Sequence, residues 1–297
     1  MMELSSLKRD KVTAMYFILP TMLLIGGLLF FPIGKAFVDS LYKSTLVLVK
    51  PQFVGFGNYI KIVTTDVFWQ VLWHSVVWTV VVITFQFLIG LGSALLLDKY
   101  FPGRNVIRGI IILPWIIPGV IAGMLWVLLY DPQLGMINRI LYELGIIKSY
   151  VTWLADKNTA LFAVIFVAIW KGFPFSALMY MAALQGVSQE LIDAATIDGA
   201  GKWGQFFYVI IPAISPVIRI TLLLTAIWTF NYFEIIYVMT RGGPGNSTHI
   251  FPTYIYNVGF KQFRFGLAAS YALITFIMLL IFSLRYMKEL DKRELLD

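Results

Sequence analysis

The segment Glu190–Pro212, "ELIDAATIDGAGKWGQFFYVIIP", is polar and contains glycine, yet it lies between two long apolar stretches. Ser188 precedes it and is placed to cap a short helix, because a serine hydroxyl can accept a hydrogen bond from a free amide of the first turn. The residues Gln189–Ile197 favour this helix, and Asp198-Gly199 should end it. The sequence therefore predicts a short helix with defined ends between two apolar segments.

A second short helix should run from Lys202 to about Tyr208, and Pro212 should mark the entry into the next apolar helix. Within the first short helix, Ala194 and Ala195 have small side chains, so that another surface could approach closely. These properties suit a docking element. They also suit an ordinary amphipathic linker at a membrane surface, and local properties alone do not separate the two.

The composition places this segment in a membrane protein. Of 297 residues, 59% are hydrophobic and 13% are charged, whereas an ordinary soluble domain has about 25% charged residues. The net charge of +7 comes from basic residues scattered among the connecting segments, so it does not indicate a nucleic-acid partner. Cysteine is absent and the only histidines are His74 and His249, so we expect no disulfide and no metal site.

Six apolar runs are long enough to cross the hydrocarbon core as helices. They are Ala14–Phe31, Leu72–Leu97, Ile107–Leu129, Ala160–Ala183, Ala213–Ile236 and Leu267–Tyr286. Lys and Arg are denser in the two termini and in the loops after the second and fourth runs than in the other loops, which predicts cytoplasmic termini. No connecting segment is long enough for an independent core. The sequence thus predicts an all-α integral membrane protein, one domain over residues 1–297, with the opening segment in the cytoplasm.

The pattern D-A-A, three residues, G, nine residues and V-x-I-P begins at Asp193 and ends at Pro212. It resembles the "EAA" loop of the permease subunits of bacterial ABC importers, in which the pattern is Glu-Ala-Ala, three residues, Gly, nine residues and Ile-x-Leu-Pro. The differences conserve charge or bulk. This resemblance favours the docking interpretation over the linker.

Four further stretches are similar to the sugar-type permeases of this family, which include glycerol-phosphate permeases. They are "FVGFGNYI", "LPWIIPGVIAGMLWVLLYDPQLGMIN", "IWKGFPFSALMYMAALQGVSQELIDAATIDGA" and "FNYFEIIYVMTRGGPGNST". The resemblance implies a type I importer permease fold in a prokaryotic inner membrane. It also implies a coupling loop over residues 188–212 that docks on a cytoplasmic ATPase dimer. The coupling residues would be Glu190, Asp193, Ala194, Ala195, Asp198 and Gly199.

The same resemblance implies two more partners, a second permease subunit that forms a heterodimer and an extracytoplasmic solute-binding protein. The latter would face Pro32–Val71 and the loop Arg241–Thr248, "RGGPGNST". A nucleotide site of the chain's own is not expected, because the surroundings of Gly201-Lys202 lack the glycine and the hydroxyl residue of a phosphate-binding loop. We therefore expect no cofactor in this chain, with ATP and magnesium on the ATPase.

Lys171 is the most informative ionisable residue inside an apolar run, because it lies near the middle of the fourth run and cannot reach an interface. It could satisfy backbone carbonyls freed by Pro174, pair with Glu234 in a structural role, or contribute to a substrate pathway. On the fifth run, Thr221 and Thr225 could simply bond back to their own helix.

A sugar presents apolar ring faces and hydroxyl edges, which aromatic rings beside amide and carboxylate groups can match. The candidate pathway residues are therefore Trp170, Lys171, Trp228, Asn231, Tyr232 and Glu234. Two other functions fit the sequence less well. An ion-coupled secondary carrier, the runner-up, needs carboxylates at membrane depth and matched halves, and no carboxylate lies near the middle of a run. A membrane-embedded enzyme needs a cluster of acid, base and metal ligands, which the runs lack.

Overall fold

The computed structural model describes residues 2–46 and 50–294, and the side chains of 13–46 and 50–289. It is helical apart from one two-stranded hairpin. The chain forms two compact units, the first from residues 1–65 and 255–277 and the second from 66–254 and 278–297. The single-domain organisation expected for residues 1–297 stays a prediction.

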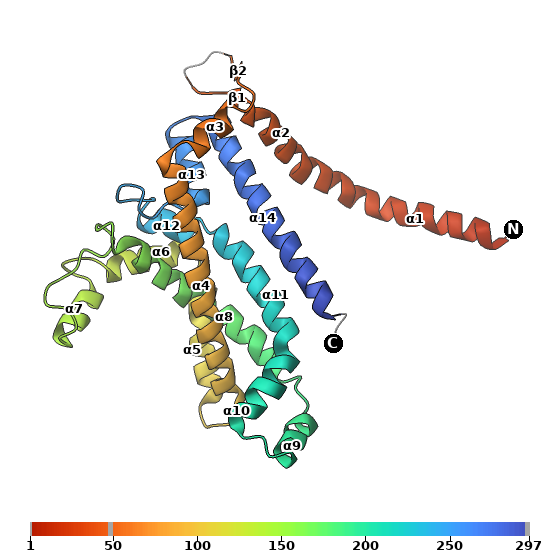
Figure 1. Ribbon diagram of the computed structural model, residues 1–297, viewed down its shortest axis with the longest axis vertical. Coiled ribbons are helices and arrows are strands. Elements are labelled where there is room, and N and C mark those ends of the chain that lie inside the picture. The colour runs from red at the N-terminus through yellow and green to blue at the C-terminus, as the bar shows by residue number, and fades with distance from the viewer. Residues whose placement is uncertain (1, 47–49, 295–297) are drawn as a thin grey trace. The chain divides into compact units, whose positions relative to one another are not determined.

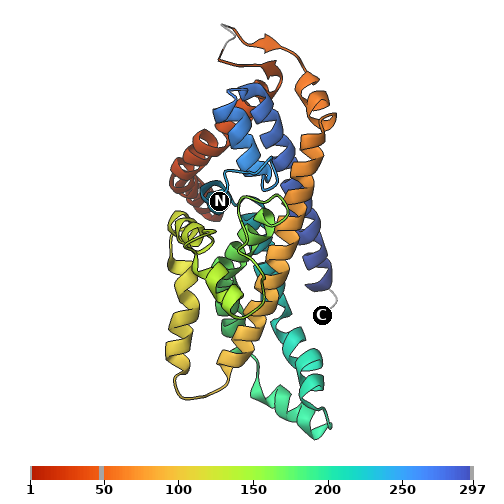
Figure 2. The same ribbon diagram turned by 90° about the vertical axis from the view of Figure 1, so that its left-hand side faces the viewer.

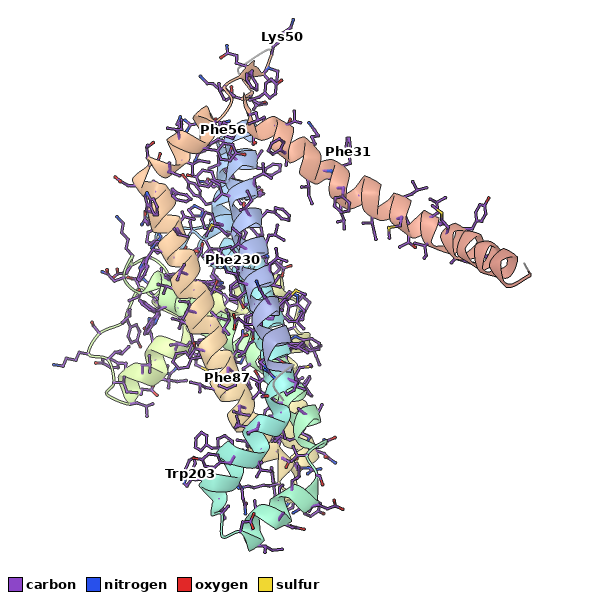
Figure 3. The ribbon with its side chains drawn as sticks, turned by 45° about the vertical axis from the view of Figure 1, so that its right-hand side comes forward. Phe31, Lys50, Phe56, Phe87, Trp203 and Phe230 are labelled. Carbon is purple, nitrogen blue, oxygen red and sulfur yellow. The ribbon has the colours of Figure 1, made fainter. Side chains whose placement is uncertain are left out.

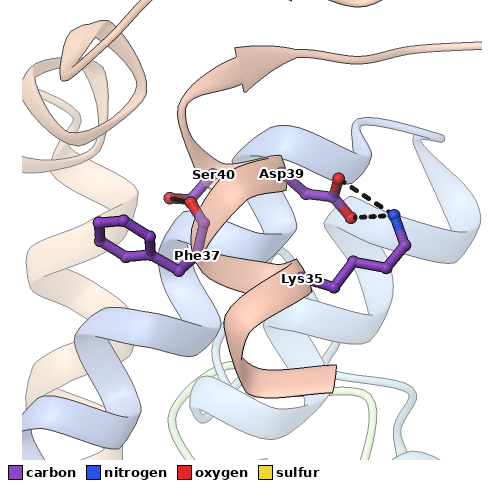
Figure 4. A network of polar contacts seen from close by, with 4 residues as sticks. All are labelled: Lys35, Phe37, Asp39 and Ser40. Carbon is purple, nitrogen blue, oxygen red and sulfur yellow. Dashed lines mark hydrogen bonds and ion pairs between the residues drawn. The ribbon is translucent and has the colours of Figure 1, made fainter. Parts of the chain in front are cut away.

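The first unit contains long helices and a small hairpin (Figure 1). Its elements are α1 (Met2–Ile25), η1 (Gly26–Phe30), α2 (Phe31–Ser40), β1 (Tyr42–Lys43), β2 (Gln52–Phe53), α3 (Gly57–Val63), η3 (Asn257–Lys261) and the first part of α14 (Phe265–Glu294). In α2, Lys35 Nζ lies 3.1 Å from Asp39 Oδ2, and the Ser40 hydroxyl donates to the carbonyl of Phe37 (Figure 4). The buried amide of Asn58 then holds the turn after α2 by donating to the carbonyls of Ser40 and Tyr42.

The second unit contains most of the apolar helices and the loop of residues 188–212. Its elements are α4 (Asp66–Asp98), α5 (Arg104–Ile116), α6 (Gly119–Leu129), α7 (Met136–Glu143), α8 (Ala160–Leu184), α9 (Gln189–Ile197), α10 (Lys202–Gln205), η2 (Phe206–Ile210), α11 (Ile211–Phe230), α12 (Glu234–Met239) and most of α13 (Phe251–Tyr256). The loops that follow α4 and α8 lie at the same end of this unit (Figures 1 and 2). Helices α4 and α8 therefore run in the same direction, and both begin at the other end of the unit.

Five helical segments of the described chain are long and apolar enough to cross a membrane. They are Thr13–Ser40, Asp66–Asp98, Ala160–Leu184, Lys202–Met239 and Phe265–Glu289. The bent pair α5–α6 makes a sixth if it is counted as one span. The six predicted runs therefore all fall on membrane-length helical segments, while the cytoplasmic placement of the termini stays a prediction.

Two of the predicted spans differ from a single straight helix. The third, Ile107–Leu129, is broken at Ile117-Pro118, and its two halves meet at 98°. The reason is local, because Pro118 lacks an amide hydrogen and disfavours a helical residue before it, and Ile117 is accordingly extended. In the fifth span, α11 ends at Phe230 and α12 begins at Glu234, so the helix is interrupted there as well.

Helices α4 and α8 run parallel and form the centre of the second unit. They approach closely at Gly90, where an added Cβ would lie 2.7 Å from the Cβ of Ser176. Buried apolar side chains fill two clusters along this pair. One contains Trp78, Val82 and residues of α8 and α12, and the other contains Leu91, Tyr180 and Ile214.

Candidate functional site

The first half of the loop between α8 and α11 has the structure that its sequence predicts. Helix α9 spans Gln189–Ile197, and the Ser188 hydroxyl caps it by accepting from the amide of Glu190 at 3.2 Å. At the other end, Gly199 has a φ of 81°, a left-handed conformation that suits glycine. The amide of Gly199 donates to the carbonyl of Thr196, and the amide of Ala200 donates to that of Ala195 at 2.9 Å. These two bonds form a Schellman cap, which fixes where α9 ends.

The second short helix, expected from Lys202 to about Tyr208, is instead the start of a longer helical segment, since α10 continues through η2 into α11. A side chain ties it to α9. Gln205 donates to the hydroxyl of Thr196 at 2.9 Å and to the carbonyl of Ala200 at 3.2 Å. Several large apolar side chains of this loop are nevertheless exposed, among them Ile197 at 87% and Trp203 at 76%. Figure 3 shows where Trp203 lies on the loop. An internally bonded loop that exposes apolar side chains is typical of a surface that contacts another protein.

The expected coupling residues lie together on this loop. Glu190, Asp193 and Ala194 are exposed on α9, whereas Ala195 is partly buried. Asp198 forms the C-terminal cap of α9 and precedes the left-handed Gly199. The loop therefore presents carboxylates and small side chains beside the exposed apolar residues.

A cavity of about 160 Å³ lies near the middle of α4, between α4, α8, α11 and the end of α5. Five of its twelve lining residues are aromatic. Its lining residues are Trp78, Val82, Gln86, Trp115, Ala168, Lys171, Gly172, Phe175, Thr225, Trp228, Thr229 and Tyr232. The ring of Phe175 stacks on Trp115 with centroids 6.1 Å apart and meets Trp228 edge-on at 5.0 Å. The rings of Trp78 and Tyr232 are also stacked, with centroids 6.2 Å apart.

Three polar side chains of the cavity have backbone partners, namely those of Gln86, Thr225 and Lys171. The amide of Gln86 donates to the carbonyl of Ala168 at 3.1 Å, and Gly172 leaves the space that this amide occupies. The sequence suggested bonds back to the helix for both Thr221 and Thr225, but only the Thr225 hydroxyl bonds back, to the carbonyl of Thr221, whereas the Thr221 hydroxyl is buried with no partner in the described part of the chain. Among the described residues, the cavity thus combines aromatic faces with a few fixed polar groups.

Lys171 reaches across to the break in the third span. Its ammonium donates to the carbonyl of Ile117 at 2.6 Å and to that of Trp115 at 3.3 Å. The sequence predicted that Lys171 satisfies carbonyls or meets Glu234, but placed the carbonyls in its own helix, next to Pro174. The partners belong to α5 instead, more than fifty residues away in the chain.

Three of the six predicted pathway residues, Lys171, Trp228 and Tyr232, line the cavity. The others lie beside it: Trp170 packs edge-on against Trp126, and Asn231 caps α11 by donating to the carbonyl of Ile227. Glu234 lies against the first residue of α6, where a Cβ added to Gly119 would collide with its carboxylate.

The sequence interpretation missed Trp78, Gln86, Trp115 and Phe175 as lining residues. Gln86 could have been found, because an amide in the middle of an apolar span needs a partner at membrane depth. The three aromatic residues carry no such signal, because the same rings occur throughout apolar helices.

The glycine-rich loop Arg241–Thr248 is ordered by its own contacts. Gly242 has a φ of 88°, and the ring of His249 packs against it so closely that no Cβ would fit. Thr253 bonds the other side of this ring at 3.1 Å. Burial, with a smaller contribution from His74, lowers the pKa of His249 to about 4, so the ring is neutral at pH 7.

Comparisons with known proteins agree with this arrangement. Residues 86–293 match the family of binding-protein-dependent transport system inner membrane components. The trehalose/maltose transport system permease protein MalF of Thermococcus litoralis is 33% identical over 274 residues, which cover 91% of each chain.

Two solved structures share the fold. The chain superposes with a TM-score of 0.84 and 22% identity on a bacterial ABC transporter involved in the import of the acidic polysaccharide alginate, and 99% of each chain is covered. The alginate transporter in complex with an alginate pentasaccharide-bound periplasmic protein gives a TM-score of 0.82 and 22% identity, covering 95% of this chain and 94% of that one. With its membrane-length helices and the extent of the family match, the chain belongs to the inner-membrane permease subunits of binding-protein-dependent ABC importers.

Proposed function

We propose that this permease subunit imports a sugar, oligosaccharide or related polyol, driven by ATP hydrolysis on a separate cytoplasmic ATPase dimer. The main support for the proposal is the preformed helix α9, which is capped by Ser188 and ended by Gly199 and exposes Glu190, Asp193 and Ala194. A sugar is favoured as the substrate because MalF is a relative of this chain and the alginate transporter shares its fold. The aromatic side chains of the cavity wall also suit a sugar.

The energy comes from another chain in this proposal. ATP and magnesium bind to the ATPase, since the only Gly-Lys pair near the loop, Gly201-Lys202, is followed by Trp203 rather than by Ser or Thr. Glu190, Asp193 and the small face at Ala194 and Ala195 contact the ATPase, whose movement α9 passes to α8 and α11.

Two further partners complete the transporter. A second permease subunit pairs with this one as a heterodimer. A solute-binding protein delivers the sugar, and residues 32–71 and 241–248 face it. The periplasmic protein bound to the alginate transporter supports this partner by analogy of fold.

The sugar passes through the aromatic cavity in the second unit. Trp228 and Tyr232 offer ring faces to the apolar side of a pyranose ring, and the polar residue Thr229 lies next to them. Trp170, Asn231 and Glu234, just outside the lining, support the same pathway.

Replacing Trp228 tests the cavity. We expect Trp228→Ala to lower the apparent sugar affinity of uptake by about tenfold to a hundredfold, since aromatic contacts with a ligand contribute on the order of 1–3 kcal/mol. Trp228→Phe keeps an aromatic face and should retain most of the affinity. The measurement is the sugar dependence of ATP-driven uptake by the assembled complex. Uptake by Trp228→Ala with unchanged sugar dependence would place the sugar elsewhere.

A further inference from the structure

The break in the third span leaves backbone groups without helical partners. Helix α5 ends at Ile116, Ile117 is extended, and α6 begins at Gly119 after Pro118. The last carbonyls of α5 and the first amides of α6 therefore lose their partners in the helix. At membrane depth such groups are costly unless other groups satisfy or compensate them.

Lys171 places a positive charge at the carboxyl end of α5. The ammonium of Lys171 donates to the carbonyls of Trp115 and Ile117, which belong to the carboxyl end of α5. The helix dipole gives this end a partial negative charge, so the cation both fills the hydrogen bonds and matches the sign. Lys171 comes from α8, which packs against α5.

Glu234 places a negative charge at the amino end of α6. An oxygen of the Glu234 carboxylate lies where a Cβ at Gly119 would be, beside the first turn of α6, and this end of a helix carries partial positive charge. Glu234 starts α12, which packs along α6 so closely that a Cβ at Gly123 would lie 3.0 Å from Val238. Lys171 and Glu234 also attract each other across the break.

We propose that Lys171 and Glu234 are positioning residues that hold the broken third span, each against the half-helix end of opposite sign. By fixing the end of α5 they fix Trp115, which forms part of the cavity wall and stacks on Phe175. The importance of this wall for transport rests on the proposed function. The positioning of the two half-helices by Lys171 and Glu234, which we call the brace, does not depend on it.

The arrangement has a consequence for substrate charge. Lys171 uses two of its three ammonium donors on carbonyls, and Glu234 opposes its charge. Because those donors are already bonded to the end of α5, Lys171 shapes the wall rather than selecting an acidic sugar.

The experiment uses the absence of cysteine from the chain. A single Thr229→Cys in the cavity wall, in the full complex, reports access through its rate of reaction with a water-soluble thiol reagent. We expect Lys171→Met to raise that rate by about tenfold, the change that follows from losing one hydrogen bond to a charged group. Glu234→Gln should raise it as well, because it removes the negative charge beside the start of α6. Gly119→Ala should do the same while leaving both charges in the chain, because the added methyl group displaces the Glu234 carboxylate.

Gly109→Ala is the matched control, since a Cβ at Gly109 in the same broken span meets no atom within 4 Å. Its labelling rate should equal that of the parent. If Lys171→Met does not assemble, Glu234→Gln and Gly119→Ala still decide the question. Unchanged labelling in these variants, or an unchanged rate in Lys171→Met together with a switched preference between neutral and acidic sugars, would overturn the proposal. If the variants are labelled faster but the parent complex transports no sugar, the proposed function is wrong and the positioning role of Lys171 and Glu234 still holds.

Discussion

Replacing Ala195 by tryptophan is expected to abolish sugar uptake while the permease still inserts in the membrane. Ala195 lies on α9, the helix that the proposal docks on the ATPase, and its small side chain permits close approach. A tryptophan there would act as a wedge between the two proteins, because packed interfaces tolerate added volume poorly. Uptake of labelled sugar by the assembled complex measures the effect, and recovery of the ATPase with the purified permease measures the docking.

The matched control at this position is Ala195→Ser, which keeps the side chain small. We expect it to transport and to retain the ATPase as the parent does. Full uptake by Ala195→Trp with the ATPase still bound would mean that α9 is an amphipathic linker and that the docking interpretation is wrong.

The second large effect is expected at Gly199, which ends α9 with a φ of 81°. A β-branched residue is strained in this region by about 1–3 kcal/mol, so Gly199→Val should open the Schellman cap and redirect the chain towards α10. No atom lies within 4 Å of a Cβ built at Gly199, so the strain comes from the backbone and not from a clash. We expect loss of uptake and weaker recovery of the ATPase.

Gly199→Asn separates this cause from a general intolerance of side chains. Asparagine adopts the left-handed conformation more readily than other residues. It should therefore keep most of the uptake that Gly199→Val loses. Equal uptake by the valine variant and the parent would show that the geometry of this cap does not matter for transport.

The loop could be predicted from the sequence because its signals are local. A capping serine, a nine-residue helix and a glycine in a left-handed position act over a few residues, and the structure reproduces Ser188, Gln189–Ile197 and Gly199 in those roles. The six apolar runs were predictable for a similar reason, since membrane thickness sets their length.

The cavity was less predictable because its contacts join distant parts of the chain. Hydropathy does not distinguish a straight span from one broken at Pro118, and it gave no sign that Lys171 would bond the carbonyl of Ile117. Asn231 looked like a ligand group in an uninterrupted span. It caps a helix because α11 stops at Phe230, which only the packed structure reveals.

Uptake into sealed vesicles that contain the complete transporter tests the central claim most directly. The vesicles receive the solute-binding protein and labelled sugar on one side and ATP with magnesium on the side of α9. We expect sugar accumulation only with hydrolysable ATP, and no accumulation without the ATPase subunits or from an imposed proton or sodium gradient. Accumulation driven by such a gradient, in vesicles without ATP, would identify an ion-coupled carrier and contradict the account.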